Sequence, residues 1–169
     1  MKKVILISCL ILISTNFVRA QEWQRYFQFG IGTGYLMDAD INDTPFLLFE
    51  YGKSYKWVDI AAALEYARYY KENYLSLTLK TKADFVKMFR TDSRHSFKLG
   101  IGMGIGTTKF KDLYNSYDGP GHNYVLFSTM ASYEFKIVDK TWLGVFFNNY
   151  SDDTFLSLNY LSLSIRRNF

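Results

Sequence analysis

The chain has 169 residues, of which 19% are aromatic and only two are proline, a composition that suits strands better than a helical domain. We expect residues 1–20 to be removed, and because Lys2, Lys3 and Arg19 leave without any acid, the formal net charge falls from +4 to +1. This excludes the basic surface of a nucleic-acid-binding protein. The single cysteine, Cys9, leaves too, which excludes a disulfide, a thiolate catalyst and a cysteine-ligated metal in the remaining chain.

Residues 1–20 have the pattern of a secretory signal. A positive start is followed by an almost wholly apolar run at 4–13, and the segment ends on the small residue Ala20. The run is too short for a transmembrane helix, which needs about 20 apolar residues. Cys9 follows a segment that has the form of a lipoprotein cleavage box, but too few apolar residues precede it. We predict a cleaved signal at 1–20 and one domain over 21–169.

From residue 23 onward, hydrophobicity alternates with period two, which indicates strands with two different faces. Apolar residues occupy most alternate positions of four segments, at 23–35, 58–67, 75–85 and 97–105. Four further candidate strands are 45–53, 124–135, 142–149 and 154–169. The stretch 46–49 has no clean alternation, so its facing stays open. The links at 38–44, 54–56, 71–73, 90–95, 111–122, 137–140 and 150–153 mostly carry turn residues.

Eight consecutive strands with short links and no helical pattern predict a meander, and closure is the simplest way to remove its two edges. We therefore expect an all-β fold, an antiparallel up-and-down β-barrel of eight strands. A soluble lipocalin-like barrel would show the same alternation with the two faces exchanged. The charges on the polar faces do not decide between the two; they are Glu65, Lys80, Lys82, Asp84, Lys98, Glu134 and Arg166.

Three observations favour a barrel whose apolar face is outside, in a membrane. The chain ends in Phe169 after alternating apolar residues, although Arg167 departs from that alternation. Charges on the apolar faces, such as Arg25, Arg68 and Lys87, lie near strand ends, where they cost little. Aromatic residues gather at expected strand ends, as membrane-interface girdles require; these are Trp23, Trp57, Tyr69, Tyr70, Tyr74, Phe89, Phe135, Trp142, Tyr150 and Phe155.

The signal, the domain length, the eight amphipathic strands and terminal Phe169 together resemble the small OmpA/OmpX-like outer-membrane barrel family across the whole of 21–169. The resemblance implies a transmembrane β-barrel in the outer membrane, surrounded by its lipids and lipopolysaccharide. It also implies contact with the barrel assembly machinery through the C-terminal strand that ends at Phe169. We expect a narrow interior in which glycines and paired charges pack without a wide channel, and we expect no cofactor.

With the N-terminus in the periplasm, the links 38–44, 71–73, 111–122 and 150–153 would face outside, and their formal charge is −6. Asp38, Asp40 and Asn42 begin a calcium-loop spacing, but the glycine and the closing glutamate are missing, so we expect no metal site. The link 111–122 is either a contact element or a plain solvated turn. The candidate binding residues are Asp38, Asp40, Asp43, Tyr114, Tyr117, Asp118, Asp152 and Asp153.

Asn149-Tyr150-Ser151 is similar to the His-x-Ser segment of the lipid A deacylase family. Asparagine stands where that family needs histidine, and a neutral amide cannot accept the serine proton. Nothing in the spacing makes His122 a substitute base, and His95 is expected at the opposite end. The leading hypothesis is a non-enzymatic envelope or surface-binding barrel. The alternatives are a lipid-modifying hydrolase and a soluble lipocalin-like carrier.

Overall fold

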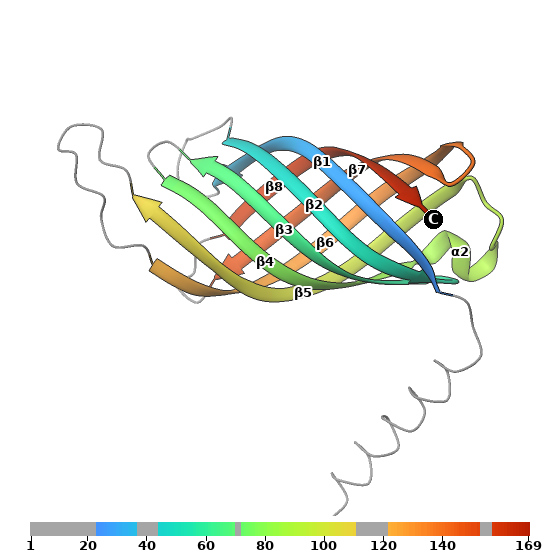
Figure 1. Cartoon of the computed structure of the whole chain (residues 1–169), viewed down its shortest axis with the longest axis horizontal. Helices are drawn as coiled ribbons and strands as arrows, with labels where there is room; N and C mark the ends of the chain where they lie inside the picture. Colours follow the sequence, from blue (N-terminus) through green and yellow to red (C-terminus); the bar gives the residue numbers. More distant parts are fainter. Residues whose placement is uncertain (1–22, 37–43, 70–71, 111–121, 153–156) are drawn as a thin grey trace, which may run out of the picture.

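The computed structural model describes residues 23–36, 44–69, 72–110, 122–152 and 157–169. They form eight antiparallel strands that close into one barrel in chain order, as predicted (Figure 1). The strands are β1 (Gln24–Leu36), β2 (Thr44–Tyr55), β3 (Val58–Tyr69), β4 (Glu72–Asp84), β5 (His95–Phe110), β6 (His122–Val138), β7 (Thr141–Asp152) and β8 (Ser157–Asn168). The predicted signal at 1–20 lies outside the described residues. No helix among the described residues is long and apolar enough to span a membrane.

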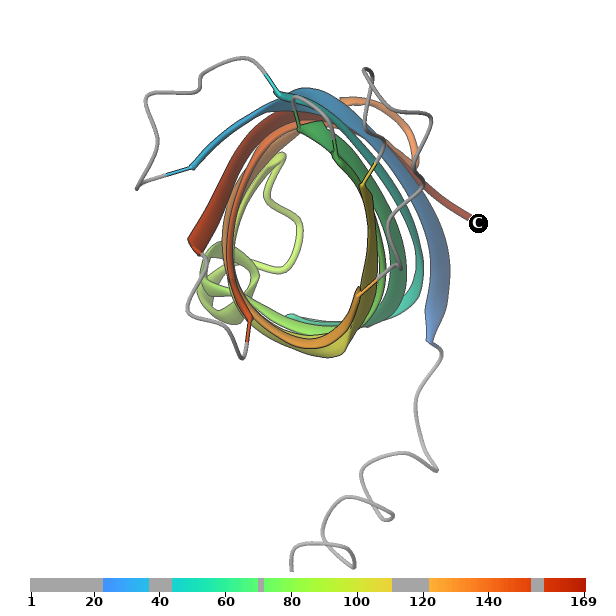
Figure 2. The ribbon, with the colours of Figure 1, turned by 90° about the vertical axis from the view of Figure 1, so that its left-hand side faces the viewer.

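Every strand pairs with its two neighbours, and β1 pairs with β8 to complete the ring that is seen along the barrel axis in Figure 2. The register pairs can be followed once around the barrel from Arg25 on β1. They lead through Lys53, Ile60 and Thr81, and return to β1 at Tyr35. This offset of ten residues tilts the strands and leaves an interior that side chains can fill.

The two faces of each strand differ as the alternation predicts. Many large apolar side chains on the outer face are exposed, the most exposed on the strands being Leu79 (69%), Ile101 (68%) and Ile105 (66%). Charged, small and polar side chains on the inner face are buried. The facing of 46–49 is now defined, because Phe46 and Leu48 are buried inside while Phe49 is exposed outside. The alternation fails there because that part of the interior is itself apolar.

The sequence shows no helical pattern, yet one short helix lies between two of the strands. β4 ends at Asp84, and a short helix, α2 (Phe85–Phe89), follows before β5. Asp84 is the N-cap, since its side chain accepts hydrogen bonds from the backbone N–H groups of Val86 and Lys87. Lys87 was expected on the apolar outer face of a strand, and α2 instead turns it toward the interior.

The barrel has two different ends. The first carries the beginning of β1, the end of β8, α2 and the two short turns at 55–58 and 138–141, and we call it the turn end (Figure 1). Both short turns contain a lysine with positive φ, Lys56 (44°) and Lys140 (61°). We call the opposite end, at which β1 ends and β2 begins, the loop end. In outer-membrane barrels the short turns are periplasmic and the longer loops are extracellular.

Candidate functional site

The barrel interior holds nine buried charged side chains among the described residues, five acids and four bases. They come from six of the eight strands and are 1–3% exposed. The acids are Glu50, Asp59, Glu65, Asp84 and Glu134, and the bases are Lys80, Lys82, Lys98 and Arg166. Charges this deeply buried are stable only when paired and hydrogen-bonded, so the geometry of the pairs decides what the interior can do.

The largest group of pairs lies toward the turn end and joins four strands. The Arg166 guanidinium contacts Asp59, with Nη1 2.5 Å from Oδ2 and Nη2 3.4 Å from Oδ1. The Lys98 ammonium lies 2.9 Å from Asp59 Oδ2 and 2.7 Å from Glu134 Oε2. The Arg166 guanidinium also lies 3.7 Å from the centroid of the Tyr26 ring. Two cations thus share two carboxylates across the width of the barrel.

Two further pairs continue toward the loop end. Lys82 bonds Glu50, which also accepts a 2.7 Å hydrogen bond from the Tyr26 hydroxyl. Lys80 bonds Glu65, and the Tyr150 hydroxyl donates to the same carboxylate. We name these residues, with the group around Arg166, the charged half of the interior: Tyr26, Glu50, Asp59, Glu65, Lys80, Lys82, Lys98, Glu134 and Arg166.

The interior changes character toward the loop end, where buried aromatic and aliphatic side chains replace the charges. We call this the aromatic half, and it consists of the buried residues Phe46, Leu48, Tyr74, Leu126, Tyr150 and Tyr160 with the partly buried Tyr124. The rings of Phe46 and Tyr160 are stacked with centroids 4.3 Å apart, and Tyr150 meets Tyr160 edge-on at 5.5 Å. These geometries are the favoured ones for aromatic pairs.

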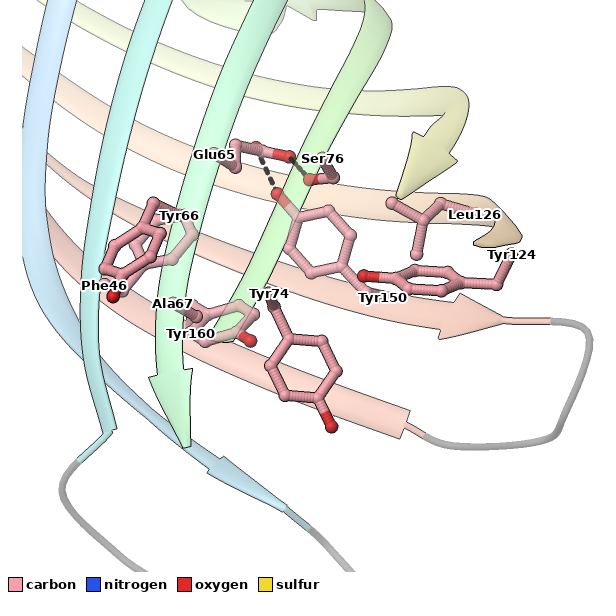
Figure 3. A pocket seen from close by; sticks show the side chains of 10 residues that line it. All are labelled: Phe46, Glu65, Tyr66, Ala67, Tyr74, Ser76, Tyr124, Leu126, Tyr150 and Tyr160. Atoms are coloured by element: carbon pink, nitrogen blue, oxygen red, sulfur yellow. Dashed lines mark hydrogen bonds between the residues drawn. The ribbon is translucent and has the colours of Figure 1, made fainter. Parts of the chain in front are cut away.

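The aromatic half surrounds a small pocket, which Figure 3 shows from close by. The Tyr150 hydroxyl points at Glu65, and Ser76 donates a 3.2 Å hydrogen bond to the same carboxylate, so Glu65 lies where the two halves meet (Figure 3). The pocket volume is about 20 Å³, which is room for about one water molecule. A solute larger than about one water molecule does not fit among these rings.

The glycines of β5 give these side chains their space. A Cβ atom built at Gly100 would lie 2.7 Å from Cγ of Lys82, and one at Gly106 would lie 2.4 Å from the Tyr124 ring. Both distances are too short for real contacts, so a larger residue at either position would force its neighbour to move. The inner face of β5 therefore carries no side chain at these glycines, and long side chains of β4 and β6 pack against its backbone.

The turn end of the interior is covered by α2 and the residues around it. The Ser96 hydroxyl donates a 2.6 Å hydrogen bond to Asp84, and the Lys87 ammonium lies 3.8 Å from Asp84 and 4.5 Å above the Trp142 ring. Burial lowers the pKa of the Lys87 ammonium from its ordinary value, and the charges of Lys98 and Arg166 lower it further. Lys87 supplies a fifth cation opposite the five buried acids.

All seven interior charges that the sequence singled out lie buried inside the barrel. Sequence reasoning missed two partners, Glu50 and Asp59. Asp59 shares its face with Glu65 by simple alternation, so that signal was available. Glu50 follows the stretch 46–49, whose facing the sequence did not define. Of the candidate loop residues, Asp152 ends β7 with its side chain undescribed, and the other seven lie outside the described residues.

The expected aromatic girdle is wrong for three of its members. Tyr74, Trp142 and Tyr150 are buried inside the barrel, with exposures of 8%, 6% and 3%. Trp57 and Phe135, by contrast, are exposed on the outside at the turn end. Tyr70 and Phe155 lie outside the described residues, and the Tyr69 side chain is not described. The interior needs large rings to fill it, so position at a strand end does not by itself place a ring at the membrane surface.

Asn149 and Ser151, the residues of the deacylase-like segment, lie on the outer face of β7. The Asn149 amide donates a 2.8 Å hydrogen bond to Asn159 on β8. His95 lies at the turn end, where its Nδ1 atom is 2.6 Å from the Tyr133 hydroxyl, and the His122 side chain is not described. The described residues therefore place no histidine beside Ser151.

The outer face forms an apolar belt around the barrel. Water-soluble monomeric proteins rarely expose an apolar surface of this extent. Ile31, Leu77, Met103, Phe127 and Leu163 are 52–60% exposed on five different strands. Charged residues on the same face keep to strand ends, as Arg25 and Arg167 do at the turn end. Apolar outside and polar inside is the arrangement of a barrel in a lipid bilayer.

No family model matches the sequence, and no curated protein matches it. Solved structures do match its fold. Neisserial surface protein A is 11% identical with a TM-score of 0.68, over 87% of this chain and 97% of that one. Ail of Yersinia pestis, in complex with the heparin analogue sucrose octasulfate, is 12% identical with a TM-score of 0.64, over 88% and 99%.

The N-terminal β-barrel domain of Pseudomonas aeruginosa OprF is 9% identical with a TM-score of 0.58, over 88% of this chain and all of that one. All three matches cover nearly the whole of both chains, so the similarity concerns the complete barrel and not a shared hairpin. Together with the closed ring of eight strands and the apolar belt, they show that this chain has the fold of the small eight-stranded outer-membrane β-barrels.

Proposed function

We propose that the protein is a non-enzymatic barrel of the outer membrane that holds its loop end at the cell surface and gives no passage to solutes. The observation that carries this proposal is the filled interior. Arg166, Asp59, Lys98 and Glu134 fill part of the charged half, stacked rings fill the aromatic half, and the pocket that the aromatic half surrounds has a volume of only about 20 Å³. A filled barrel of this kind can hold its loops at the cell surface, whereas a pore would need an open path through both halves of the interior.

The test is single-channel recording in planar lipid bilayers with the purified full-length protein. We expect no conductance at the level of a general porin. The double variant Phe46→Ala/Tyr160→Ala removes the stacked pair, and it should also fail to conduct because the charged half still fills the barrel. Steady conductance of the unchanged protein at porin level would contradict the closed interior.

The proposed surface role rests on the chemistry of the segments 38–44, 71–73, 111–122 and 150–153, whose formal charge is −6 in the sequence. Such a charge repels polyanions and favours a neutral or cationic partner, unlike the sulfated ligand found with Ail. The residues proposed to contribute are Asp38, Asp40, Asp43, Tyr114, Tyr117, Asp118, Asp152 and Asp153. Tyrosine and aspartate are suited to adaptable recognition in loops.

Deleting 112–121 tests the loop assignment separately from the barrel. The deletion lies between β5 and β6 and touches no described interior contact, so we expect the heat-modifiable electrophoretic shift of a folded barrel to remain. Binding of immobilised polylysine, a cationic probe, should fall, while heparin should bind neither protein. Unchanged polylysine binding after the deletion would contradict the assignment of this segment as the contact element.

A further inference from the structure

Helix α2 exposes an apolar face that the barrel does not cover. Phe85, Met88 and Phe89 are 42%, 44% and 89% exposed. Residues three and four apart share one face of a helix, so these three side chains lie together. Phe89 is the most exposed of all the large hydrophobic residues that the structure describes. A face of this kind needs an apolar partner.

The direction of this face follows from two contacts on opposite sides of α2. The Phe85 ring lies 6.4 Å from the ring of Phe97, which is exposed in the outer row of β5. Lys87, on the other side of the helix, reaches Trp142 and Asp84 within the barrel. The apolar face of α2 therefore lies on the outer side of the barrel and continues the apolar belt beyond the end of β4. It does not face the barrel interior.

Exposed basic residues lie at the same end of the barrel as this face. Arg90 and Arg94 follow α2 directly and are exposed, and Lys140 is exposed in the neighbouring turn. The exposed acids nearby are fewer, and one of them, Asp139, is bound by Lys136 at 2.9 Å. Long basic side chains beside apolar rings fit a membrane interface, where the rings enter the lipid and the cations meet anionic headgroups.

We propose that α2 is an interfacial anchor, which inserts Met88 and Phe89 among anionic phospholipids of the bilayer leaflet at the turn end, with Arg90 and Arg94 on the phosphate groups. The anchor is independent of any binding at the loop end. It would fix the depth and tilt of the barrel, because a helix lying in the interface resists movement of the adjoining strands β4 and β5 along the membrane normal.

Spin labelling at single cysteines tests the anchor in the full-length chain. A nitroxide is attached at Phe89→Cys in the background Cys9→Ser, and the matched control is Thr91→Cys, an exposed position in the same turn. The protein is placed in nanodiscs of phosphatidylcholine and phosphatidylglycerol at roughly 3:1, to supply anionic headgroups. Collision with oxygen, which concentrates in lipid, is compared with collision with a water-soluble nickel chelate.

We expect the ratio of oxygen to nickel collisions to be severalfold higher at position 89 than at position 91. The ratio at 89 should fall in nanodiscs of phosphatidylcholine alone and in the Arg90→Gln/Arg94→Gln variant. Heat-modifiable electrophoresis checks that each variant is folded. A ratio at 89 equal to that at 91 would overturn the proposal and leave the face for a protein partner. A ratio that is high but identical in neutral discs would overturn the role of anionic headgroups.

Discussion

The charged half and the aromatic half fill the same barrel by different means. In the charged half, directional contacts tie together strands that are not neighbours, as when Arg166 of β8 binds Asp59 of β3 across the interior. In the aromatic half, Phe46, Tyr150 and Tyr160 fill space with rings and use few hydrogen bonds. The stability of the charged half depends on every charge keeping its partner. The stability of the aromatic half depends on how completely the rings fill the space.

The difference implies different responses to mutation. Removing one member of a buried ion cluster leaves its partners charged and unpaired, which costs more than the pair itself contributes. Removing part of a ring leaves a cavity, whose cost depends on how well neighbours collapse into it. The comparison can therefore be tested by changing one residue at a time in each half and measuring the free energy of unfolding.

The largest loss is expected for Arg166→Met. Asp59 and Glu134 would keep only Lys98 as a close cation, and the free energy of unfolding should fall by about 3–5 kcal/mol. Urea titration of the protein in lipid vesicles measures this. The control is Arg167→Met, on the outer face next to it, for which we expect a change below about 1 kcal/mol. Equal effects of the two variants would contradict the role of the charged half.

A smaller loss is expected for Phe46→Leu in the aromatic half. The variant loses the stacked contact with Tyr160 and leaves a small gap, so the free energy of unfolding should fall by about 1–2 kcal/mol. The control is Phe49→Leu, whose ring lies on the outer face in lipid and should cost less. A loss for Phe46→Leu as large as that of Arg166→Met would show that the two halves do not differ as described.

The smallest effect is expected at Asn148, on the inner face of β7. Its amide is fully buried and neither polar atom has a hydrogen-bond partner among the described residues. Asn148→Leu should leave the free energy of unfolding unchanged or raise it by about 1 kcal/mol. Gln28→Met is the control, because Gln28 donates a 2.9 Å hydrogen bond to Ser164 and should lose about 1 kcal/mol. A clear loss at Asn148 would reveal a partner that the side-chain contacts do not include.

The alternation of apolar and polar residues predicted the barrel, because the two faces of every strand meet different environments. A residue such as Leu77 can face only one of them, so its character indicates its side. The alternation left the facing of Phe46 and Leu48 open because the inner face near the loop end is apolar too, so both faces look alike in the sequence. It missed α2 because a five-residue helix started by one cap, Asp84, is too short to show a helical period.

The candidate site was predicted less completely than the fold. The sequence identified Lys98 and Arg166 as interior charges, but it could not assign their partners, since Asp59 comes to Arg166 through the closure of β8 on β1. Trp142 was expected at the membrane surface, but its side chain lies inside the barrel, where the Lys87 ammonium of α2 lies 4.5 Å from the centroid of its ring. Such contacts join residues far apart in the chain, and no local pattern records them.

The apolar rows of the strands should touch lipid while the charged rows lie inside, and photolabelling restricted to the bilayer distinguishes the two sets of residues. A carbene precursor confined to the hydrocarbon region is activated in vesicles that contain the folded protein, and the labelled residues are found by mass spectrometry. We expect label on Leu77 and Ile101 and none on Lys80 and Lys98. Label on the two lysines in preference to Leu77 and Ile101 would contradict it.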